Sequence, residues 1–208
     1  AGASTGYLAM VDSCTGARLD SFDSPMLGNQ AIPGLTDPGL LGGKLYLHAA
    51  APVGVPGGYV RFDVASKTFD GMLASLPKFS NGLDETWQMA VGAGGLWFSG
   101  SRAYDQPDAA LPVLAHSDGD GGHCATAVPM STFLDERSGR AIAVSGNDIY
   151  QISTSAQALI HHFDATQCTL QPCACAATWR STPFTITGIF MGAFQALVIG
   201  QRLYIDGV

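Results

Sequence analysis

The sequence predicts an all-β protein, a β-propeller with four blades of about 52 residues each. Two landmarks recur along its 208 residues. The first is Leu or Ile followed by an aromatic residue, after a glycine turn, at spacings of 51, 53 and 54 residues: Tyr46, Trp97, Tyr150 and Tyr204. The second is an aspartate at the end of a strand, at spacings of 51, 55 and 46 residues: Asp12, Asp63, Asp118 and Asp164. Such a period suits propeller blades, because a single blade cannot bury both faces of its sheet.

Each repeat is expected to contain a small apolar strand, a glycine turn, the aromatic strand, a loop and the strand that ends in aspartate. The apolar strands are expected at Trp87–Val91, Ala141–Val144 and Ala196–Ile199, with a weaker, Pro- and Gly-rich segment at Gly34–Leu41. A turn of small residues follows each aspartate, and then a further strand. Aspartate accepts hydrogen bonds from the backbone two residues on, so we predict a structural role for these four side chains.

The two ends of the chain carry complementary halves of the repeat. The first expected strand, Gly6–Asp12, is of the aspartate type, and the last, Gln201–Asp206, is of the aromatic type. Pairing between them would complete the fourth blade and remove two open sheet edges. The sequence therefore predicts one domain over residues 1–208, closed by its terminal strands, with the four aromatic residues packed between blades. The alternative is that the chain is part of a seven- or eight-bladed propeller.

The turn Asp12-Ser13-Cys14-Thr15-Gly16 resembles a known repeat family. It is similar to the D-x-x-T-G turn of the quinoprotein-dehydrogenase and YVTN-type propeller repeats. That family usually carries a docking Trp after the turn, where this chain has Leu19–Phe22. The resemblance therefore implies the propeller superfamily and carries over no cofactor or site residue.

Composition excludes some classes of partner. The formal net charge is −7 and no cluster of Lys and Arg occurs, so a surface that neutralises phosphates, and with it nucleic acid binding, is excluded. No run of about 18 apolar residues occurs, so no membrane span is expected. The chain begins without Met, which fits a mature secreted product or an excised fragment.

The five cysteines favour an oxidising compartment: Cys14, Cys124, Cys168, Cys173 and Cys175. Their spacing lacks the two Cys-x-x-Cys pairs of a zinc site, so we expect disulfides and an extracellular or periplasmic location. The connectivity is open. An odd count leaves one thiol free or paired with another chain.

One glycine-rich segment carries oxygen ligands suited to a metal. Asp118 and Asp120 alternate with glycine, and two such carboxylates can bind Ca²⁺. The distal Glu of an EF-hand is absent, and a solvated hairpin turn is the alternative interpretation. A zinc site at His116, His123 and Cys124 would lack an evident fourth ligand. No other cofactor is indicated.

Two long loops are the expected ligand-binding surface. The loops Ala50–Gly58 and Arg102–Pro112 both follow an aromatic strand, so they should emerge on the same face of the predicted disc. We expect Arg102, Tyr104 and Asp105 to contact the ligand.

No catalytic constellation is evident, since the chain has no G-x-S-x-G motif and no glycine-rich phosphate loop before a helix. The sequence therefore favours a secreted or periplasmic module that binds a protein or a glycan, rather than an enzyme. Two alternatives stay open. One is a hydrolase, lyase or quinone-linked oxidoreductase with its site over a central channel, and the other is a structural subunit or fragment of a larger assembly.

Overall fold

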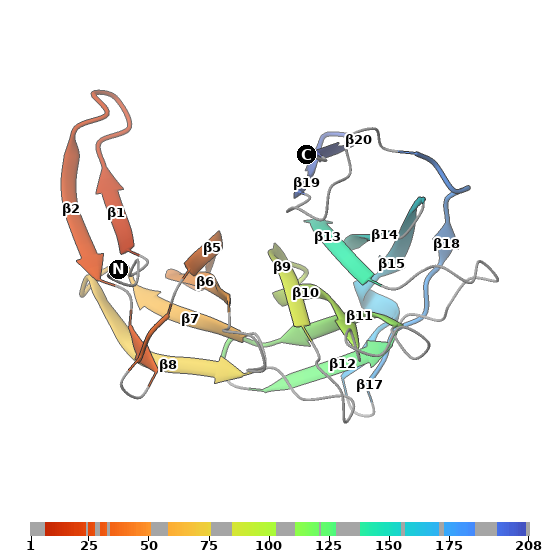
Figure 1. The fold of residues 1–208 in the computed structure, drawn as a ribbon, viewed down its shortest axis with the longest axis horizontal. Helices are drawn as coiled ribbons and strands as arrows, with labels where there is room; N and C mark the ends of the chain where they lie inside the picture. Colours follow the sequence, from red (N-terminus) through yellow and green to blue (C-terminus); the bar gives the residue numbers. More distant parts are fainter. Residues whose placement is uncertain are drawn as a thin grey trace. The chain divides into compact units, whose positions relative to one another are not determined.

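The computed structural model describes residues 7–23, 25–27, 30–32, 34–50, 58–75, 85–102, 111–120, 122–127, 138–154, 157–170, 173–185 and 195–206 (Figure 1). The chain divides into two compact units, Ala1–Ser75 and Leu76–Val208, which are described separately here. That the whole chain is one domain stays a prediction.

The first unit contains two small hairpins and one four-stranded sheet. The hairpins pair β1 (Tyr7–Val11) with β2 (Arg18–Asp23) and β3 (Met26–Leu27) with β4 (Gln30–Ala31). The sheet is an antiparallel meander in the order β5-β6-β7-β8. Its strands are β5 (Gly34–Leu41), β6 (Lys44–Ala50), β7 (Gly58–Asp63) and β8 (Thr68–Ser75).

The second unit contains two four-stranded antiparallel sheets and two hairpins. One sheet has the order β9-β10-β11-β12, and its strands are β9 (Glu85–Gly92), β10 (Gly95–Arg102), β11 (Leu111–Ser117) and β12 (His123–Ala127). The other has the order β13-β14-β15-β18, and its strands are β13 (Ser138–Ser145), β14 (Asp148–Thr154), β15 (Ala158–Asp164) and β18 (Trp179–Arg180). The hairpins pair β16 (Thr169–Leu170) with β17 (Cys173–Ala174), and β19 (Gln195–Ile199) with β20 (Arg202–Asp206). A short 3-10 helix, Ala165–Gln167, follows β15.

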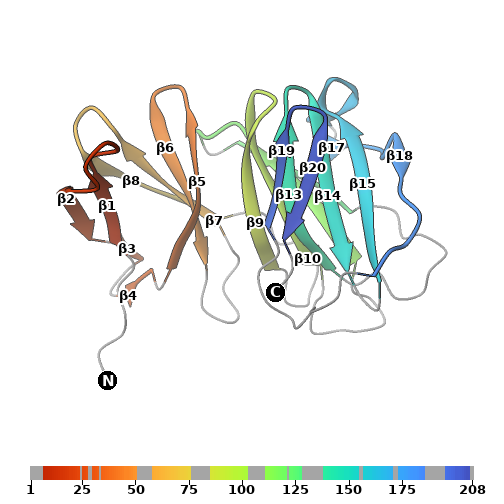
Figure 2. The same cartoon turned by 90° about the horizontal axis from the view of Figure 1, so that it is seen from above.

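Apolar side chains between adjacent layers form the cores. In the first unit the buried cluster is Ile32, Leu47, Ala49 and Val60. In the second unit the two four-stranded sheets share a cluster of Trp97, Leu114, Ile142, Ile149 and Phe163. On the other side of β13 and β14, Ile152 packs with Ala196 and Ile205 of the last hairpin. Figure 2 shows β19 and β20 beside β13 and β14, in agreement with the contact between β19 and β13.

The structure confirms the repeating strands and their turns. All four expected apolar strands are present, including the weaker Gly34–Leu41. The glycine turns between apolar and aromatic strands contain backbone in the left-handed region, with φ of 78° at Gly43 and 60° at Gly200. Glycine adopts this conformation without steric cost, and it lets two strands be joined by a tight turn.

The four recurring aspartates have the structural role predicted for them. Each accepts a hydrogen bond from the backbone N–H two residues on, at 2.9 Å in every case: Asp12, Asp63, Asp118 and Asp164. These bonds satisfy backbone donors that the strands leave unpaired at the turn.

The predicted fold needs correction. The chain is all-β, as expected, but the prediction of a four-bladed propeller closed by its terminal strands is wrong. β1 pairs with β2 and β19 pairs with β20, and no ladder joins β1 to β20 in the described part of the chain. The described strands form seven separate antiparallel sheets, and none closes on itself. The β-propeller prediction is therefore replaced by an all-β chain of separate sheets. The physical reason is that a repeat specifies the hairpin of each unit locally, whereas ring closure needs a long-range pairing that the repeat does not encode.

The third repeat also departs from the expected pattern. The sequence predicts a further strand after the turn at Asp164, but the chain forms the 3-10 helix and the β16-β17 hairpin there. The fourth place in this sheet is taken by β18, which has two residues and pairs Trp179 with His162.

Candidate interaction face

Three aromatic side chains lie in one row across the sheet β13-β14-β15-β18. Tyr150 on β14 is paired with His162 on β15, and His162 is paired with Trp179 on β18. Residues directly opposite each other in an antiparallel sheet point to the same face, so the strand register alone brings the three rings together. We call Tyr150, His162 and Trp179 the aromatic row.

The rings of the aromatic row contact one another and remain accessible. His162 stacks on Trp179 with ring planes 5° apart and centroids 5.1 Å apart. Tyr150 meets His162 at 5.1 Å and Trp179 at 6.3 Å in tilted geometry. Trp179 is 46% exposed, and Tyr150 is half-buried. A large aromatic ring left this open on a sheet face is typical of a surface that contacts another molecule.

Polar groups hold the central ring of the row in place. His162 Nε2 lies 2.9 Å from Asp148 Oδ1, and Nδ1 contacts the hydroxyl of Thr178. Thr178 is itself fixed to β15, because its N–H donates to the carbonyl of His162 at 2.8 Å. Burial raises the pKa of Tyr150, and the nearby Asp148 carboxylate raises it further. Tyr150 is thus a neutral phenol at physiological pH.

The preceding repeat contains a counterpart of this row. Trp97 on β10 is paired with His116 on β11, and the two rings are 4.4 Å apart. Trp97 and Tyr150 occupy the same position in their repeats. Yet Trp97 is only 3% exposed, because Ile142, Ile149 and Phe163 of the next sheet cover it. The same arrangement of side chains is therefore a sheet-packing surface in one repeat and an exposed surface in the next.

The last hairpin also has exposed apolar side chains, on its side that faces away from β13 and β14. Leu197, Ile199 and Tyr204 alternate with half-buried residues along β19 and β20, and all three are exposed. The prediction that all four repeat aromatics are core residues is therefore wrong for two of them. Tyr46 and Trp97 are buried, whereas Tyr150 is half-buried and Tyr204 is exposed.

The structure does not test the ligand-binding residues that the sequence predicts in the long loops. Arg102 is the last residue of β10, and its side chain lies outside the described part, as do Tyr104 and Asp105 entirely. Their role as ligand contacts stays a prediction.

The predicted calcium ligands lie in the turn between β11 and β12. Asp118 Oδ1 accepts the N–H groups of Asp120 and Gly122, at 2.9 Å and 3.1 Å. Both aspartates are exposed. Among the residues that the structure describes, no three His, Cys, Asp or Glu side chains gather as metal ligands. Calcium at this turn stays a prediction. The side chains of His123 and Cys124, proposed with His116 for zinc, lie outside the described part.

A buried histidine in the first unit also has hydroxyl and carboxylate neighbours. His48 Nδ1 lies 3.3 Å from Thr36 Oγ1 and 3.6 Å from Asp37 Oδ2. In a catalytic triad the nucleophile and the carboxylate contact opposite nitrogens of the imidazole, so that one proton can be taken while the other is held. Here both contact the same nitrogen, so this arrangement does not activate Thr36. Burial lowers the pKa of His48 to about 4, which keeps the ring neutral at physiological pH.

The adjacent histidines His161 and His162 point to opposite faces of β15, because successive side chains of a strand alternate between its two faces. His161 is fully buried and lies 3.1 Å from Ser153 Oγ, whereas His162 is half-buried and belongs to the aromatic row. They are not ligands of one metal ion.

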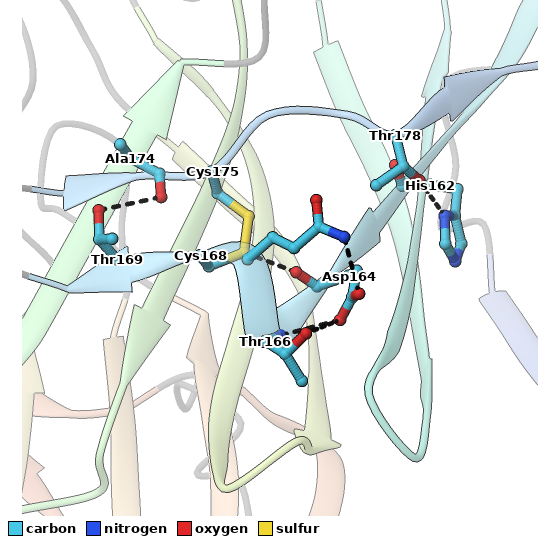
Figure 3. Close-up of a disulfide and its surroundings, with 9 residues drawn as sticks. His162, Asp164, Thr166, Cys168, Thr169, Ala174, Cys175 and Thr178 are labelled. Carbon is cyan, nitrogen blue, oxygen red and sulfur yellow. Dashed lines mark hydrogen bonds between the residues drawn. A yellow bond between two sulfur atoms is a disulfide. The ribbon is translucent and has the colours of Figure 1, made fainter.

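A disulfide joins Cys168 and Cys175 beside the candidate face (Figure 3). It closes the small loop that contains β16 and β17, just after the turn that Asp164 supports. Thr178 follows this loop in the chain and lies beside His162 of β15 in Figure 3. Cys14 is free and exposed. In the described part, no helix is long and apolar enough to cross a membrane.

Comparison with known proteins gives a likeness of fold and no family. No family model matches the chain, and no curated protein matches it. Among solved structures, hydrazine synthase of Kuenenia stuttgartiensis is similar to it, with a TM-score of 0.54 and 10% sequence identity. The match covers 83% of this chain and 52% of that chain, so this chain spans about half the length of that structure. That protein contains a β-propeller, so the likeness to propeller repeats holds at the level of the fold alone.

Sequence reasoning missed Trp179, the most exposed member of the row. Trp179 follows the cysteine-rich segment and has no place in either repeating landmark. The available signal was the strand that ends at Asp164, on which His162 and Phe163 face opposite sides of the sheet. That signal does not reveal which later residue pairs with β15.

Proposed function

We propose that this chain is a protein-binding module, and that the aromatic row on the sheet β13-β14-β15-β18 is its contact surface. The partner presents an apolar sheet face, which packs on the row as one sheet of this chain packs on another. Enzymatic activity is not part of the proposal.

The burial of the equivalent pair Trp97 and His116 in the preceding repeat is the observation that supports this proposal. Trp97 and His116 have the same register and ring contact as Tyr150 and His162, and Trp97 is buried beneath a neighbouring sheet. A side-chain pattern that accommodates a sheet in one repeat is suited to accommodate a sheet in the next. Burying a large aromatic ring stabilises an interface by about 1.5–3 kcal/mol, so Trp179 would contribute strongly.

The proposal includes an extracellular or periplasmic site of action. The Cys168–Cys175 disulfide supports this location, because disulfides persist in oxidising compartments. The free Cys14 is exposed and does not contribute to it.

The experiment compares three forms of the chain as immobilised baits in a native extract. Trp179→Glu places a charge in the row, and Val64→Glu is the matched control, since Val64 is 49% exposed and lies in the other unit. We expect a protein that binds wild type and the control, and that binds Trp179→Glu at least tenfold more weakly when its affinity is measured after purification. Equal binding to all three baits would contradict the proposed face.

A glycan is the second candidate ligand, and the exposed ring of Trp179 favours it. Flat indole faces stack on the apolar face of sugar rings, and Asp148, whose side chain is 55% exposed, could accept hydroxyl groups. A glycan panel probed with wild type and Trp179→Glu separates the two. Saturable glycan binding that Trp179→Glu abolishes, without a protein partner, would replace the first proposal with this one.

A further inference from the structure

Cys124 and Cys173 are the two cysteines whose bonding the Cys168–Cys175 disulfide and the free Cys14 leave open. Both lie in the second unit, Cys124 on β12 and Cys173 on β17. The two strands are distant in sequence, yet they contact each other, and Figure 1 shows β17 beside β12. A disulfide needs Cα atoms about 4–7 Å apart, which is a separation that neighbouring strands provide. The fold therefore brings two cysteine-bearing strands together.

The register of the sheet β9-β10-β11-β12 places Cys124 on the face that packs against the neighbouring sheet. Cys124 is paired with His116 on β11, and His116 is paired with Trp97 on β10. Residues directly opposite each other in an antiparallel sheet share a face, so these three positions form one row. Trp97 belongs to the buried cluster between the two four-stranded sheets. Cys124 thus holds the position in this row that Trp179 holds in the aromatic row.

The β16-β17 hairpin approaches the same cluster from the other side. Cys168 and Cys175 both pack against the buried cluster that contains Trp97. Cys173 on β17 lies two residues before Cys175, and positions two apart on an extended strand share a face. The position of Cys173 is therefore on the face of the hairpin that carries the disulfide. The two surfaces that meet at the cluster each hold one of the two unassigned cysteines.

From these observations we infer that Cys124 and Cys173 form a second disulfide, which joins β12 to β17. Two S–H bonds break and one Sγ–Sγ bond forms between the two side chains. The two electrons and two protons pass to the disulfide of a small molecule or of an oxidoreductase, which leaves as two thiols. This inference goes beyond the proposed function and does not depend on it.

The second disulfide holds a segment that has few ladder hydrogen bonds to the rest of the unit. In the described part of the chain, β16 and β17 pair only with each other, and β18 pairs with β15 through two residues. A bond from Cys173 to Cys124 attaches this segment, which presents Trp179, to the neighbouring sheet. It also closes a longer loop than the Cys168–Cys175 bond does, so it restricts the unfolded chain more.

The experiment counts thiols by mass spectrometry on the full chain, secreted into an oxidising compartment by its expression host and alkylated in denaturant. We expect one adduct on unreduced wild type, at Cys14, and five adducts after reduction. An unreduced tryptic digest should contain peptide 103–137, which carries Cys124, joined to peptide 141–180, which carries Cys173. Cys124→Ser and Cys173→Ser should each carry two adducts, one of them on the partner cysteine. Cys14→Ser is the matched control and should carry none.

Three or more adducts on unreduced wild type would overturn the inference, because Cys124 and Cys173 would then be thiols. Two adducts that appear only after a chelator is added would assign a metal site with His116 instead. A bond from Cys124 to either cysteine of the Cys168–Cys175 pair would also overturn it. These outcomes are read on wild type, so they hold even if a serine variant does not fold. Partner binding that Trp179→Glu leaves unchanged would reject the proposed function and leave this disulfide standing.

Discussion

Gln151 on β14 donates a hydrogen bond of 3.0 Å from Nε2 to Ser99 Oγ on β10, and thereby joins the two four-stranded sheets of the second unit. The same amide nitrogen donates to the carbonyl of Val113 on β11 at 2.7 Å. Gln88 on β9 makes the reverse connection, since its Oε1 accepts the N–H of Ile142 on β13 at 2.8 Å. Two buried glutamines thus connect sheets whose packing is otherwise apolar.

Gln151→Leu should destabilise the second unit by about 1–3 kcal/mol, because the Val113 carbonyl stays buried without its donor. Urea unfolding followed by tryptophan fluorescence measures this loss, because all three tryptophans of the chain lie in the second unit. Ser99→Ala is the matched control, and it should cost less, since the donor to Val113 remains. A Gln151→Leu variant as stable as wild type would show that the sheets are held by apolar packing alone.

His48 should make the first unit less stable in mild acid. Its pKa is lowered from 6.5 to about 4 by burial, so the unfolded chain binds a proton in this range that the folded chain does not. Stability is therefore present above pH 6.5 and is lost as the pH falls towards 4. Between about pH 7 and about pH 5 the free energy of unfolding of the first unit falls by at most about 2 kcal/mol. The Asp37 carboxylate, 3.6 Å away, reduces it by favouring the protonated ring.

Thermal melts at the two pH values, read by circular dichroism, test this effect. His48→Gln should remove most of the pH dependence in that range, while the other histidines remain as an internal control. An unchanged pH dependence in His48→Gln would assign the effect to another group.

The Cys168–Cys175 disulfide should stabilise the segment that presents Trp179. The two cysteines are 7 residues apart in sequence. A cross-link over this distance reduces the entropy of the unfolded chain and so raises the free energy of unfolding by about 2 kcal/mol. A Cys168→Ser, Cys175→Ser double variant should melt earlier and show faster amide exchange at Thr178 and Trp179. Cys14→Ser is the control, because that thiol is free, and it should leave both measurements unchanged.

Asp63 should be needed as a charged hydrogen-bond acceptor in its turn. The backbone N–H of Ser66 and then Lys44 hold the pKa of Asp63 to about 2, below its usual 3.8. Its contribution is therefore present above pH 3.8 and is lost as the pH falls towards 2. Asp63→Ala should lower the melting temperature more than Asp63→Asn, whose amide oxygen can still accept from the backbone. Equal melting temperatures for the two variants would contradict the turn as the source of the effect.

Much of the local structure could be predicted from the sequence. The aspartate turns, the glycine turns and the apolar strands depend on contacts between residues close in the chain, such as Asp12 with Cys14 and Thr15. The opposite orientations of His161 and His162 follow from strand geometry in the same way. The third repeat failed the pattern after Asp164, because a disulfide-closed loop takes the place of a regular strand.

The candidate face could not be predicted, because it depends on which strands become neighbours. Trp179 is distant in sequence from Tyr150, and only the pairing of β15 with both β14 and β18 places the two rings in one row. The sequence predicts the loop residues Arg102, Tyr104 and Asp105 as ligand contacts, since loops carry most binding residues, and that prediction stays untested.

An all-β chain of repeated hairpins follows from the amino-acid sequence alone, because turn chemistry and the alternation of apolar and polar residues act over a few residues. Which of the repeat aromatics are buried depends on how the sheets pack. Trp97 and Tyr150 have the same local sequence setting, yet Trp97 is covered by β13, β14 and β15 while Tyr150 is left half-buried. The physical reason is that burial depends on whether a neighbouring sheet is present to exclude water, and a side chain cannot supply that neighbour itself.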